Sequence, residues 1–194
     1  MSQVPTANSI FEALLGEKIE APKSDEAAAL KMEVEAFFDI FHDSLMRYLR
    51  SFEIEIQDAE DVIQEVFLAL FRHLRAGKPR TNVKGWVFRV AHNLGLKRHH
   101  KNRRLHQLTA ARGQILELHF ASECDPEQQL LNDQRRRRLL AVVRALPDRD
   151  RQCLSLRAEG LRYREIARVL GVSVGTVATV LERALKRLKE AEGR

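Results

Sequence analysis

Cysteine, tryptophan and long apolar runs are all scarce in this chain of 194 residues. Its two cysteines, Cys124 and Cys153, lie far apart, which excludes a disulfide framework and a Cys-x-x-Cys zinc site. The longest apolar run, Val66 to Phe71, has six residues, whereas a membrane-spanning helix needs about 20. The first residues also lack the basic stretch and apolar block of a secretory signal. We therefore expect a cytoplasmic protein without direct membrane insertion.

Charge of one sign is missing from two long segments. Residues 51–71 contain six acidic side chains and no Lys or Arg, whereas residues 78–112 contain ten Lys and Arg side chains and no Asp or Glu. The net charge of the whole chain is +6. Opposite charges on neighbouring segments indicate two partners, one basic and one polyanionic. Ordinary solvated helix faces remain the alternative.

Apolar residues recur three and four positions apart over most of the chain, which predicts an all-α fold of two small helical domains joined by a linker. The first domain, residues 25–101, is expected to hold three helices, with a break at Gly77 and Pro79 before the third. Trp86 is in phase with the apolar side of that third helix, so we expect it in the core. Residues 1–24 form an extension with a short apolar stripe at Ile10, Phe11, Leu14 and Leu15.

The apolar pattern loosens over residues 102–124, which predicts the linker. Asp125 and Pro126 then favour a helix start, and the second domain covers residues 125–194. We expect its first helix to stop at Pro147 and the next to end at Gly160.

The last 34 residues read as helix, short turn and helix, over 161–170, 171–173 and 174–190. Ala167 and Gly171 would permit a close crossing of the two helices, and Ser173 can cap the second. A plain helical hairpin is the alternative, although several arginines suit phosphate contacts. The stripe expected between the helices consists of Ile166, Ala167, Leu170, Val174, Val177, Leu181, Leu185 and Leu188.

Three motifs in this order resemble the extracytoplasmic-function (ECF) sigma factors of the sigma-70 family. They are DAEDVIQEVF at residues 58–67, WVFRVAHN at 86–93, and LPDRDR at 146–151 followed by YREIA at 163–167 and GVSVGTV at 171–177. The resemblance implies a bacterial transcription initiation factor, not an enzyme, with a sigma-2 and a sigma-4 domain. It implies core RNA polymerase and promoter DNA as partners, and it offers an anti-sigma protein as a further one.

In the family the acidic helix docks on the coiled coil of the polymerase beta-prime clamp, which implies a docking surface of Asp58, Asp61, Gln64 and Glu65. No basic partner for these side chains stands within the same helix before Arg72. The basic helix and its preceding loop match the part that opens and reads the promoter −10 element. The implied residues are Lys78, Arg80, Asn82, Lys84, Arg89, Asn93, Lys97, Arg98, Lys101, Arg103 and Arg104.

The helix-turn-helix would read the −35 element as duplex, with its second helix in the major groove. The implied contacts are Arg162, Arg164, Ser173, Thr176, Thr179, Glu182, Arg183 and Lys186. Ala178 and Val180 stand where the family commonly has basic residues. Basic side chains at Arg135–Arg138, Arg144, Arg149 and Arg151 suit DNA, the polymerase beta flap or solvent.

Two other classes of function compete with this interpretation. A stand-alone helix-turn-helix regulator with an N-terminal sensing or dimerisation domain would bind duplex DNA without polymerase. A nucleic-acid enzyme would need paired carboxylates beside the basic segment, which contains none. We expect no cofactor and no metal, and we interpret the histidines at 92, 99, 100 and 106 as DNA-facing or solvated.

Overall fold

The computed structural model describes residues 24–109 and 137–192. Within these ranges every regular element is a helix and no strand occurs, which confirms the all-α class. No helix in the same ranges combines the length and the apolar character of a membrane span.

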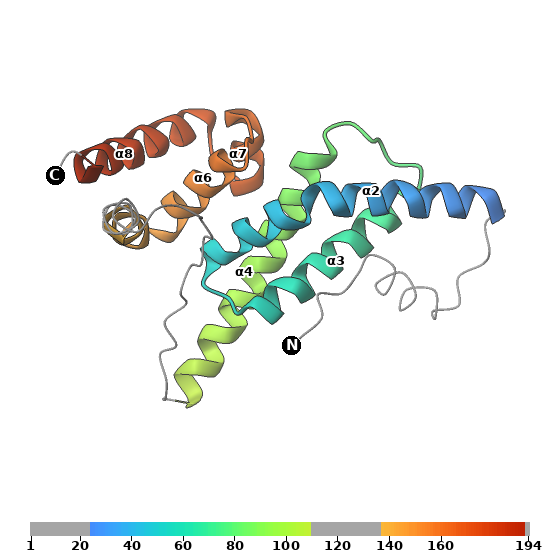
Figure 1. Ribbon diagram of the computed structural model, residues 1–194, viewed down its shortest axis with the longest axis horizontal. Coiled ribbons are helices and arrows are strands. Elements are labelled where there is room, and N and C mark those ends of the chain that lie inside the picture. The colour runs from blue at the N-terminus through green and yellow to red at the C-terminus, as the bar shows by residue number, and fades with distance from the viewer. Residues whose placement is uncertain (1–23, 110–136, 193–194) are drawn as a thin grey trace, which may run out of the picture.

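The N-terminal half consists of α2 (Ser24–Leu49), the 3-10 turn η1 (Arg50–Phe52), α3 (Ile56–Arg75) and α4 (Val83–Thr109). Figure 1 shows α3 beside α2, with α4 crossing both. These helices bury their apolar stripes against one another, and each fully buried aliphatic or aromatic side chain contributes about 1.5–3 kcal/mol. The buried set includes Val34, Phe38, Leu45, Val62, Ile63, Val66, Phe67, Leu70 and Val87.

The start of α4 is fixed by local backbone chemistry. Gly77 has φ +66° in the preceding break, and Asn82 has φ 57° directly before the helix. The Asn82 Oδ1 accepts a hydrogen bond from the Gly85 N–H at 3.1 Å, so Asn82 caps α4. The helix then runs to Thr109, eight residues beyond the predicted domain boundary, because residues 102–109 contain no Gly or Pro to end it.

The C-terminal half consists of a helix at residues 137–144, then α6 (Asp148–Ala158), α7 (Tyr163–Leu170) and α8 (Val174–Glu192). Gly160 and Gly171 have φ +80° and +65° after α6 and α7, as their predicted end positions require. A Cβ at Gly171 would meet nothing within 4 Å, so its positive φ, not a close helix crossing, calls for glycine there. The expected cap is confirmed, since Ser173 Oγ accepts from the Thr176 N–H at 3.0 Å.

The apolar face of α8 differs from the predicted stripe. Val177, Val180, Leu181 and Ala184 are buried, whereas Val174 and Leu185 are 43% and 47% exposed. The expectation that Val174 and Leu185 would be buried between the helices was wrong, because it assigned the buried positions to the larger apolar side chains. The small Ala184 occupies the buried position, on the helix that packs closely against α6.

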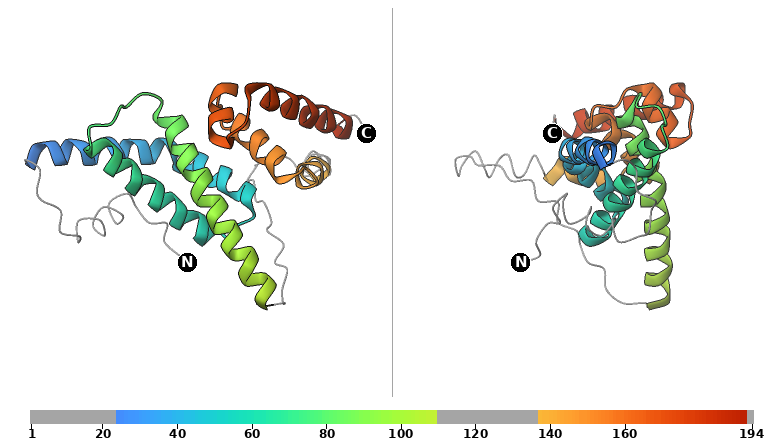
Figure 2. Two further views of the ribbon diagram at one scale, coloured as in Figure 1. Left: turned by 180° about the vertical axis from the view of Figure 1, so that it is seen from behind. Right: turned by 90° about the vertical axis from the view of Figure 1, so that its right-hand side faces the viewer.

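The two halves are in direct contact. Helix α4 packs against α7, and α6 packs against η1 and α2, as the two views of Figure 2 also show. Phe52 and Phe88 from the N-terminal half share one buried cluster with Leu156 and Leu161 from the C-terminal half. The described residues therefore form a closed arrangement, which the sequence did not predict.

His92 lies inside this arrangement and not on a DNA-facing or solvated surface, so that expectation was wrong. It is 7% exposed, and its Nδ1 lies 2.8 Å from the Tyr48 hydroxyl. Burial lowers the pKa of His92 to about 4. Phe88 stands one turn earlier on the same face of α4, and this spacing was the sequence signal for burial.

A neutral buried histidine predicts an acid-sensitive fold. Because the folded pKa lies near 4 and the ordinary value is 6.5, the unfolded chain binds the extra proton first, and the contribution of His92 to stability falls as pH drops from about 6.5 toward 4. Replacing His92 with Gln keeps an acceptor for Tyr48 but removes the titration. Urea unfolding at pH 7 and pH 5 should show a smaller loss of unfolding free energy in His92→Gln than in the wild type. Equal losses would contradict this explanation.

Candidate nucleic-acid and protein interfaces

The four acidic and amide residues predicted to dock a basic partner lie along one side of α3. The side chains of Asp61 and Glu65 are 58% and 55% exposed, while Asp58 and Gln64 are half-buried. We call Asp58, Asp61, Gln64 and Glu65 the acidic patch. Its spacing of three, three and one residues keeps the group within two helical turns, so one basic surface can reach all of it.

The acidic patch has a cationic neighbour that the sequence did not predict. Arg98 of α4 places one guanidinium nitrogen 2.7 Å from Asp58 Oδ1 and 3.4 Å from Asp61 Oδ2, and the other 3.9 Å from Glu65. Asn102, one turn further along α4, donates to the second Asp58 oxygen. Arg98 was expected to follow DNA phosphates, but in this structure it lies among carboxylates.

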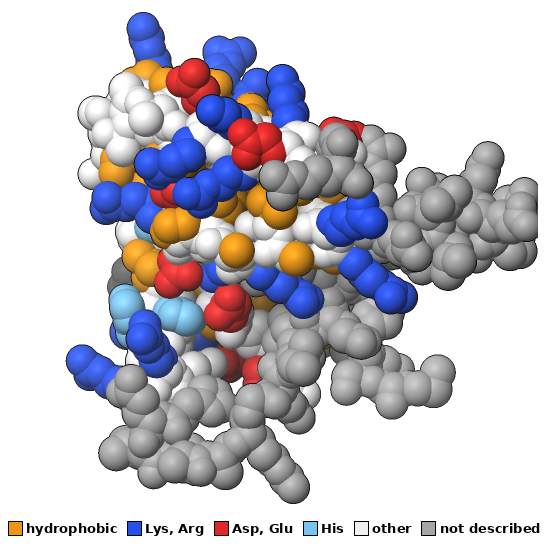
Figure 3. Space-filling view, turned by 90° about the vertical axis from the view of Figure 1, so that its left-hand side faces the viewer, with side chains coloured by type: hydrophobic (Ala, Val, Ile, Leu, Met, Phe, Trp, Pro, Cys, Tyr) orange, Lys and Arg blue, Asp and Glu red, His pale blue; other side chains and the backbone are white. Residues whose placement is uncertain are grey.

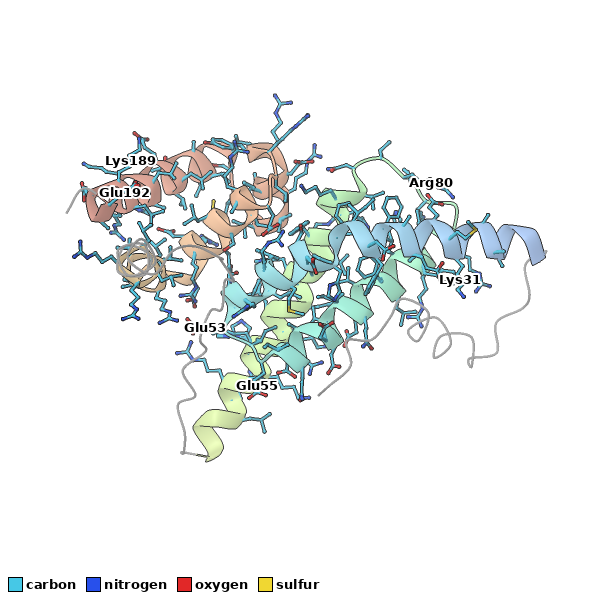
Figure 4. All side chains as sticks on the ribbon, in the orientation of Figure 1. Lys31, Glu53, Glu55, Arg80, Lys189 and Glu192 are labelled. Atoms are coloured by element: carbon cyan, nitrogen blue, oxygen red, sulfur yellow. The ribbon has the colours of Figure 1, made fainter. Side chains whose placement is uncertain are left out.

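The loop before α4 places its candidate residues in solvent. Lys78, Arg80 and Asn82 are all exposed. Arg80 nevertheless reaches back to α2, as Figure 4 shows, and its Nε and Nη2 donate to the two Glu33 carboxylate oxygens at 2.8 and 3.1 Å. Asn82 serves as the helix cap described above, so its amide oxygen already has a structural role.

Helix α4 carries a row of polar side chains at helical spacing. Five of its candidates follow one another at intervals of four, four, four and three residues, which places them along one side of the helix. All are exposed, and none forms an ion pair with another residue in the described ranges. We call this row the α4 stripe, and it consists of Arg89, Asn93, Lys97, Lys101 and Arg104.

Lys84 and Arg103 lie outside the α4 stripe. Arg103 is exposed, beside the junction with α6. Lys84 is half-buried, and its Nζ donates to the Glu159 carbonyl oxygen at 2.6 Å. The structure thus gives Lys84 a partner in the C-terminal half, although the resemblance implied a phosphate.

The helix-turn-helix exposes most of its candidates on the outer side of α8. Thr176, Thr179, Glu182 and Lys186 are exposed at intervals of three, three and four residues, which places them on one face. Ser173 is exposed too, but its hydroxyl caps the helix. Arg162 and Arg164 are exposed at the start of α7, and Figure 3 shows Lys and Arg side chains spread over the C-terminal helices.

Two arginines of the C-terminal half have internal partners. Arg183 is half-exposed, and its Nη2 lies 2.6 Å from Oδ2 of Asp150, a carboxylate that is 7% exposed. Arg151 is buried, which contradicts the expectation of a DNA, flap or solvent contact, and its Nε donates to the Ser51 carbonyl at 3.0 Å. No local sequence pattern indicates these pairings, because their members stand 33 and 100 residues apart.

Metal-binding and nucleophilic chemistry find no support in the described part of the chain. No group of three His, Cys, Asp or Glu side chains there has the geometry to hold a metal ion. Burial, with a smaller effect of Asp150, raises the pKa of the Cys153 thiol to about 11, so this cysteine stays protonated. Cys124 and the expected helix start at Asp125 lie outside the described residues, and the side chain of His106 is not among the described side chains.

Two family descriptions match the chain, and they match one half each. "Sigma-70 region 2" matches residues 37–105, and "Sigma-70, region 4" matches residues 136–188. The ECF RNA polymerase sigma factor BldN of Streptomyces coelicolor is 30% identical over 186 residues, which cover 95% of this chain and 67% of that protein. SigE of Mycolicibacterium smegmatis is 28% identical over 190 residues, with 97% and 68% covered.

Solved structures show the same fold at lower sequence identity. The sigma factor RpoE in complex with the anti-sigma factor NepR from Bartonella quintana superposes with a TM-score of 0.60 at 20% identity, covering 81% of this chain and 96% of that one. CnrH in complex with the cytosolic domain of CnrY gives a TM-score of 0.55 at 20% identity, covering 95% of both chains.

The ion pair of Arg183 predicts a stability effect that is separate from any DNA contact. Arg183→Ala leaves the buried Asp150 carboxylate without its partner, so unfolding free energy should fall by about 1–3 kcal/mol. The double variant Arg183→Ala with Asp150→Ala removes both charged groups. Its loss of unfolding free energy should be smaller than the sum of the losses in the two single variants. Urea unfolding of the four proteins measures this coupling. Strict additivity would show that the pair contributes nothing.

Proposed function

The chain belongs to the extracytoplasmic-function sigma factors of the sigma-70 family, and we propose that its charged surfaces divide the steps of transcription initiation among them. It is a transcription initiation factor that binds core RNA polymerase and promoter DNA. The observation that carries the division is the contrast between the acidic patch on α3 and the exposed cations of the α4 stripe and α8. One surface suits a basic protein, and the others suit a polyanion.

The acidic patch docks on the clamp coiled coil of the beta-prime subunit. Asp61 and Glu65 carry this role because more than half of each side chain is exposed. Arg98 holds the carboxylates in place before docking, but its pairs with Asp61 and Glu65 join it to side chains that are more than half exposed, and such pairs contribute only about 0–1 kcal/mol. A basic partner that presents several charges can therefore displace or share these carboxylates.

The α4 stripe and the preceding loop bind the melted −10 element. Arg89, Lys97, Lys101 and Arg104 supply exposed charges along one side of a helix, which suits successive phosphates of one strand. Asn93 lies exposed within this row, where its amide can contact a base edge. Trp86 lies at the start of the same helix, where it is half-buried with its ring centroid 4.6 Å from that of His73.

The helix-turn-helix binds the −35 element as duplex through the outer face of α8. Thr176, Thr179 and Glu182 lie near its N-terminus, where recognition helices place their base contacts. Glu182 can accept a hydrogen bond from the amino group of cytosine, and Lys186 can contact a phosphate. Exposed Arg149, Arg162 and Arg164 add positive charge for DNA or for the polymerase beta flap.

Regulation through a protein partner is consistent with the relatives. One of the two superposed structures contains the anti-sigma factor NepR, and the other contains the cytosolic domain of CnrY. We propose that this chain is also held by such a protein. We further propose that it works without catalytic activity of its own, in the bacterial cytoplasm where polymerase and promoter meet.

Reversing the acidic patch tests docking. Asp61→Lys with Glu65→Lys should weaken binding to core RNA polymerase at least tenfold, because a basic partner would then meet like charges. A matched control, Asp39→Lys with Glu190→Lys, makes the same change of net charge at exposed positions elsewhere. Fluorescence anisotropy measures the affinity, and circular dichroism checks that the helices persist. Equal affinity of both variants for core would refute this docking surface.

The two DNA surfaces should respond to different templates. Asn93→Ala should reduce open-complex formation on duplex promoters, because Asn93 contacts the melted strand. On templates already mismatched across the −10 region, open-complex formation by this variant should return toward the wild-type level. Glu182→Ala should relax −35 base preference by about 1–3 kcal/mol on both templates. Run-off transcription from a library randomised at both elements separates these effects. A −35 change in Asn93→Ala would overturn the assignment.

A further inference from the structure

We infer that the cavity between the two halves is a binding site for a small molecule that presents a diphosphate group. The cavity lies at the seam where η1, α4, α6 and α7 meet, and its volume is about 280 Å³. We call it the seam cavity. Its basic and imidazole lining consists of His92, His99, His100, Arg103, Arg149 and Arg151. The site goes beyond the proposed function, because neither polymerase nor promoter takes part in it.

The lining of the seam cavity carries an excess of positive charge. Against its three arginines stands a single carboxylate, Asp148, among the described residues that form the walls. Asp148 is already engaged, since it accepts a hydrogen bond from Arg151 Nη2 at 2.9 Å. Arg151 also lies 3.0 Å from Glu53, so its charge is balanced within the chain. The positive charge that is open to a ligand therefore comes from Arg103 and Arg149.

Arg103 and Arg149 stand on different walls of the seam cavity. Arg103 belongs to α4 and Arg149 to α6, and both are exposed, which places them at the rim. Neither has an ion-pair partner within the described ranges. Two like charges beside one cavity repel each other, and an anion between them removes that repulsion. Guanidinium groups also match the geometry of phosphate oxygens, so two of them suit a ligand with two phosphate groups.

His92 forms the inner wall and offers a buried polar atom to the seam cavity. The residue is 7% exposed, and its Nδ1 lies 2.8 Å from the Tyr48 hydroxyl. Its other ring nitrogen, Nε2, has no hydrogen-bond partner in the part of the chain that the structure describes. Burial raises the pKa of Tyr48, so its hydroxyl keeps the proton that Nδ1 accepts. The ring proton of neutral His92 is then on Nε2, which can donate to a phosphate oxygen.

Two further histidines add donors nearer the solvent. His99 and His100 are neighbours on α4, with ring centroids 5.9 Å apart, and both line the seam cavity. His99 is half-buried and His100 is exposed. Figure 3 shows histidine side chains next to Lys and Arg side chains just below the C-terminal helices. Imidazole and guanidinium donors thus extend from the rim to the inner wall.

Helix α6 begins at the seam cavity and adds to its positive potential. Its first residues, Asp148 and Arg149, belong to the lining. The residue before them, Pro147, makes no side-chain hydrogen bond that would cap the helix. The first N–H groups of a helix lack partners within it and carry partial positive charge, which favours an anion there. The helix end therefore acts in the same direction as the side chains around it.

The size of the seam cavity favours a small ligand. Pockets that enclose a drug-sized ligand measure roughly 300–1,000 Å³. At about 280 Å³ this cavity is smaller, so it suits the phosphate groups of a ligand and little more. Phe52, Leu96 and Leu170 complete its walls with apolar side chains. A DNA duplex can touch the rim at Arg103 and Arg149, but only a small ligand can reach His92.

Calorimetric titration of the full chain with inorganic pyrophosphate tests the site. At 0.15 M salt, where charges more than about 8 Å apart are largely screened, one equivalent should bind saturably, and orthophosphate should bind more weakly. Arg103→Ala and Arg149→Ala should each weaken binding about tenfold or more, because each removes charge-assisted hydrogen bonds. Arg149→Lys should recover part of the loss, since it restores the charge without the guanidinium geometry.

Arg104→Ala is the matched control, because it removes the same charge from the next position of α4, outside the cavity lining. Its affinity for pyrophosphate should stay within about twofold of the wild type. Circular dichroism checks that the helices persist in every variant. Absence of saturable binding, or an equal loss in Arg104→Ala and Arg103→Ala, would overturn the site.

Proton NMR of the histidine rings locates the bound pyrophosphate. The chain has seven histidines, and the signal that disappears in His92→Gln identifies the ring of His92. Pyrophosphate should shift that signal, whereas a short DNA duplex of arbitrary sequence should leave it in place. An unchanged His92 signal on addition of pyrophosphate would overturn the inference. An equal shift with DNA would assign the cavity to nucleic-acid phosphates instead.

Thermal unfolding gives an independent measure of the same binding. A ligand that binds only the folded chain stabilises it by mass action, so the unfolding midpoint should rise with pyrophosphate concentration. The rise should vanish in the double variant Arg103→Ala with Arg149→Ala and persist in Arg104→Ala. A rise that persists in the double variant would show that pyrophosphate binds elsewhere. Because all these measurements use the free chain, their outcome is separate from that of the polymerase and promoter assays.

Discussion

A buried guanidinium, that of Arg151, is the interaction on which the relation between the two halves depends. Its side chain is 9% exposed and touches the Ser51 carbonyl, Glu53 and Asp148. A charge at this depth is tolerated only when it is paired, so separating the halves requires that Arg151 be rehydrated. The contact fixes α6 against η1, which places α7 against α4 and α8 beyond it. The spacing of the two DNA surfaces follows from this one seam.

Many of the charges that suit external partners are balanced within the free chain. Arg98 lies among carboxylates of the acidic patch, Arg80 pairs with Glu33, and Arg183 pairs with Asp150. The ion pairs of Arg80 with Glu33 and of Arg98 with Asp61 lie at partly exposed positions and contribute little to stability, so a polyanion or a basic protein surface can compete for them. The pair of Arg183 differs, because its carboxylate partner Asp150 is buried. The α4 stripe differs, because its cations have no described acidic partner and are available without any exchange. In the free chain some of the groups that suit external partners are therefore engaged in internal ion pairs, while the α4 stripe is already exposed.

The helices were predictable from periodicity, while most contacts between them were not. Gly77, Pro147 and Gly160 mark their ends in the sequence, and Ser173 and Asn82 supply caps with a local mechanism. Periodicity does not reveal the closed seam, because α4 has a second apolar face in which His92 follows Phe88 by one turn, and a histidine at that position reads as a polar residue. Ion pairs such as Arg98 with Asp58, 40 residues apart, depend on how α4 crosses α3. No spacing along the chain encodes that crossing.

The most direct test of the central claim is reconstitution of transcription with this chain as the sole specificity factor. Purified core RNA polymerase alone should yield no promoter-directed run-off product. Adding the full chain should produce discrete transcripts whose start sites lie downstream of a common pair of elements. A chain that adds nothing to core polymerase, yet alone protects a two-fold symmetric duplex site from cleavage, would contradict the claim and identify a stand-alone regulator.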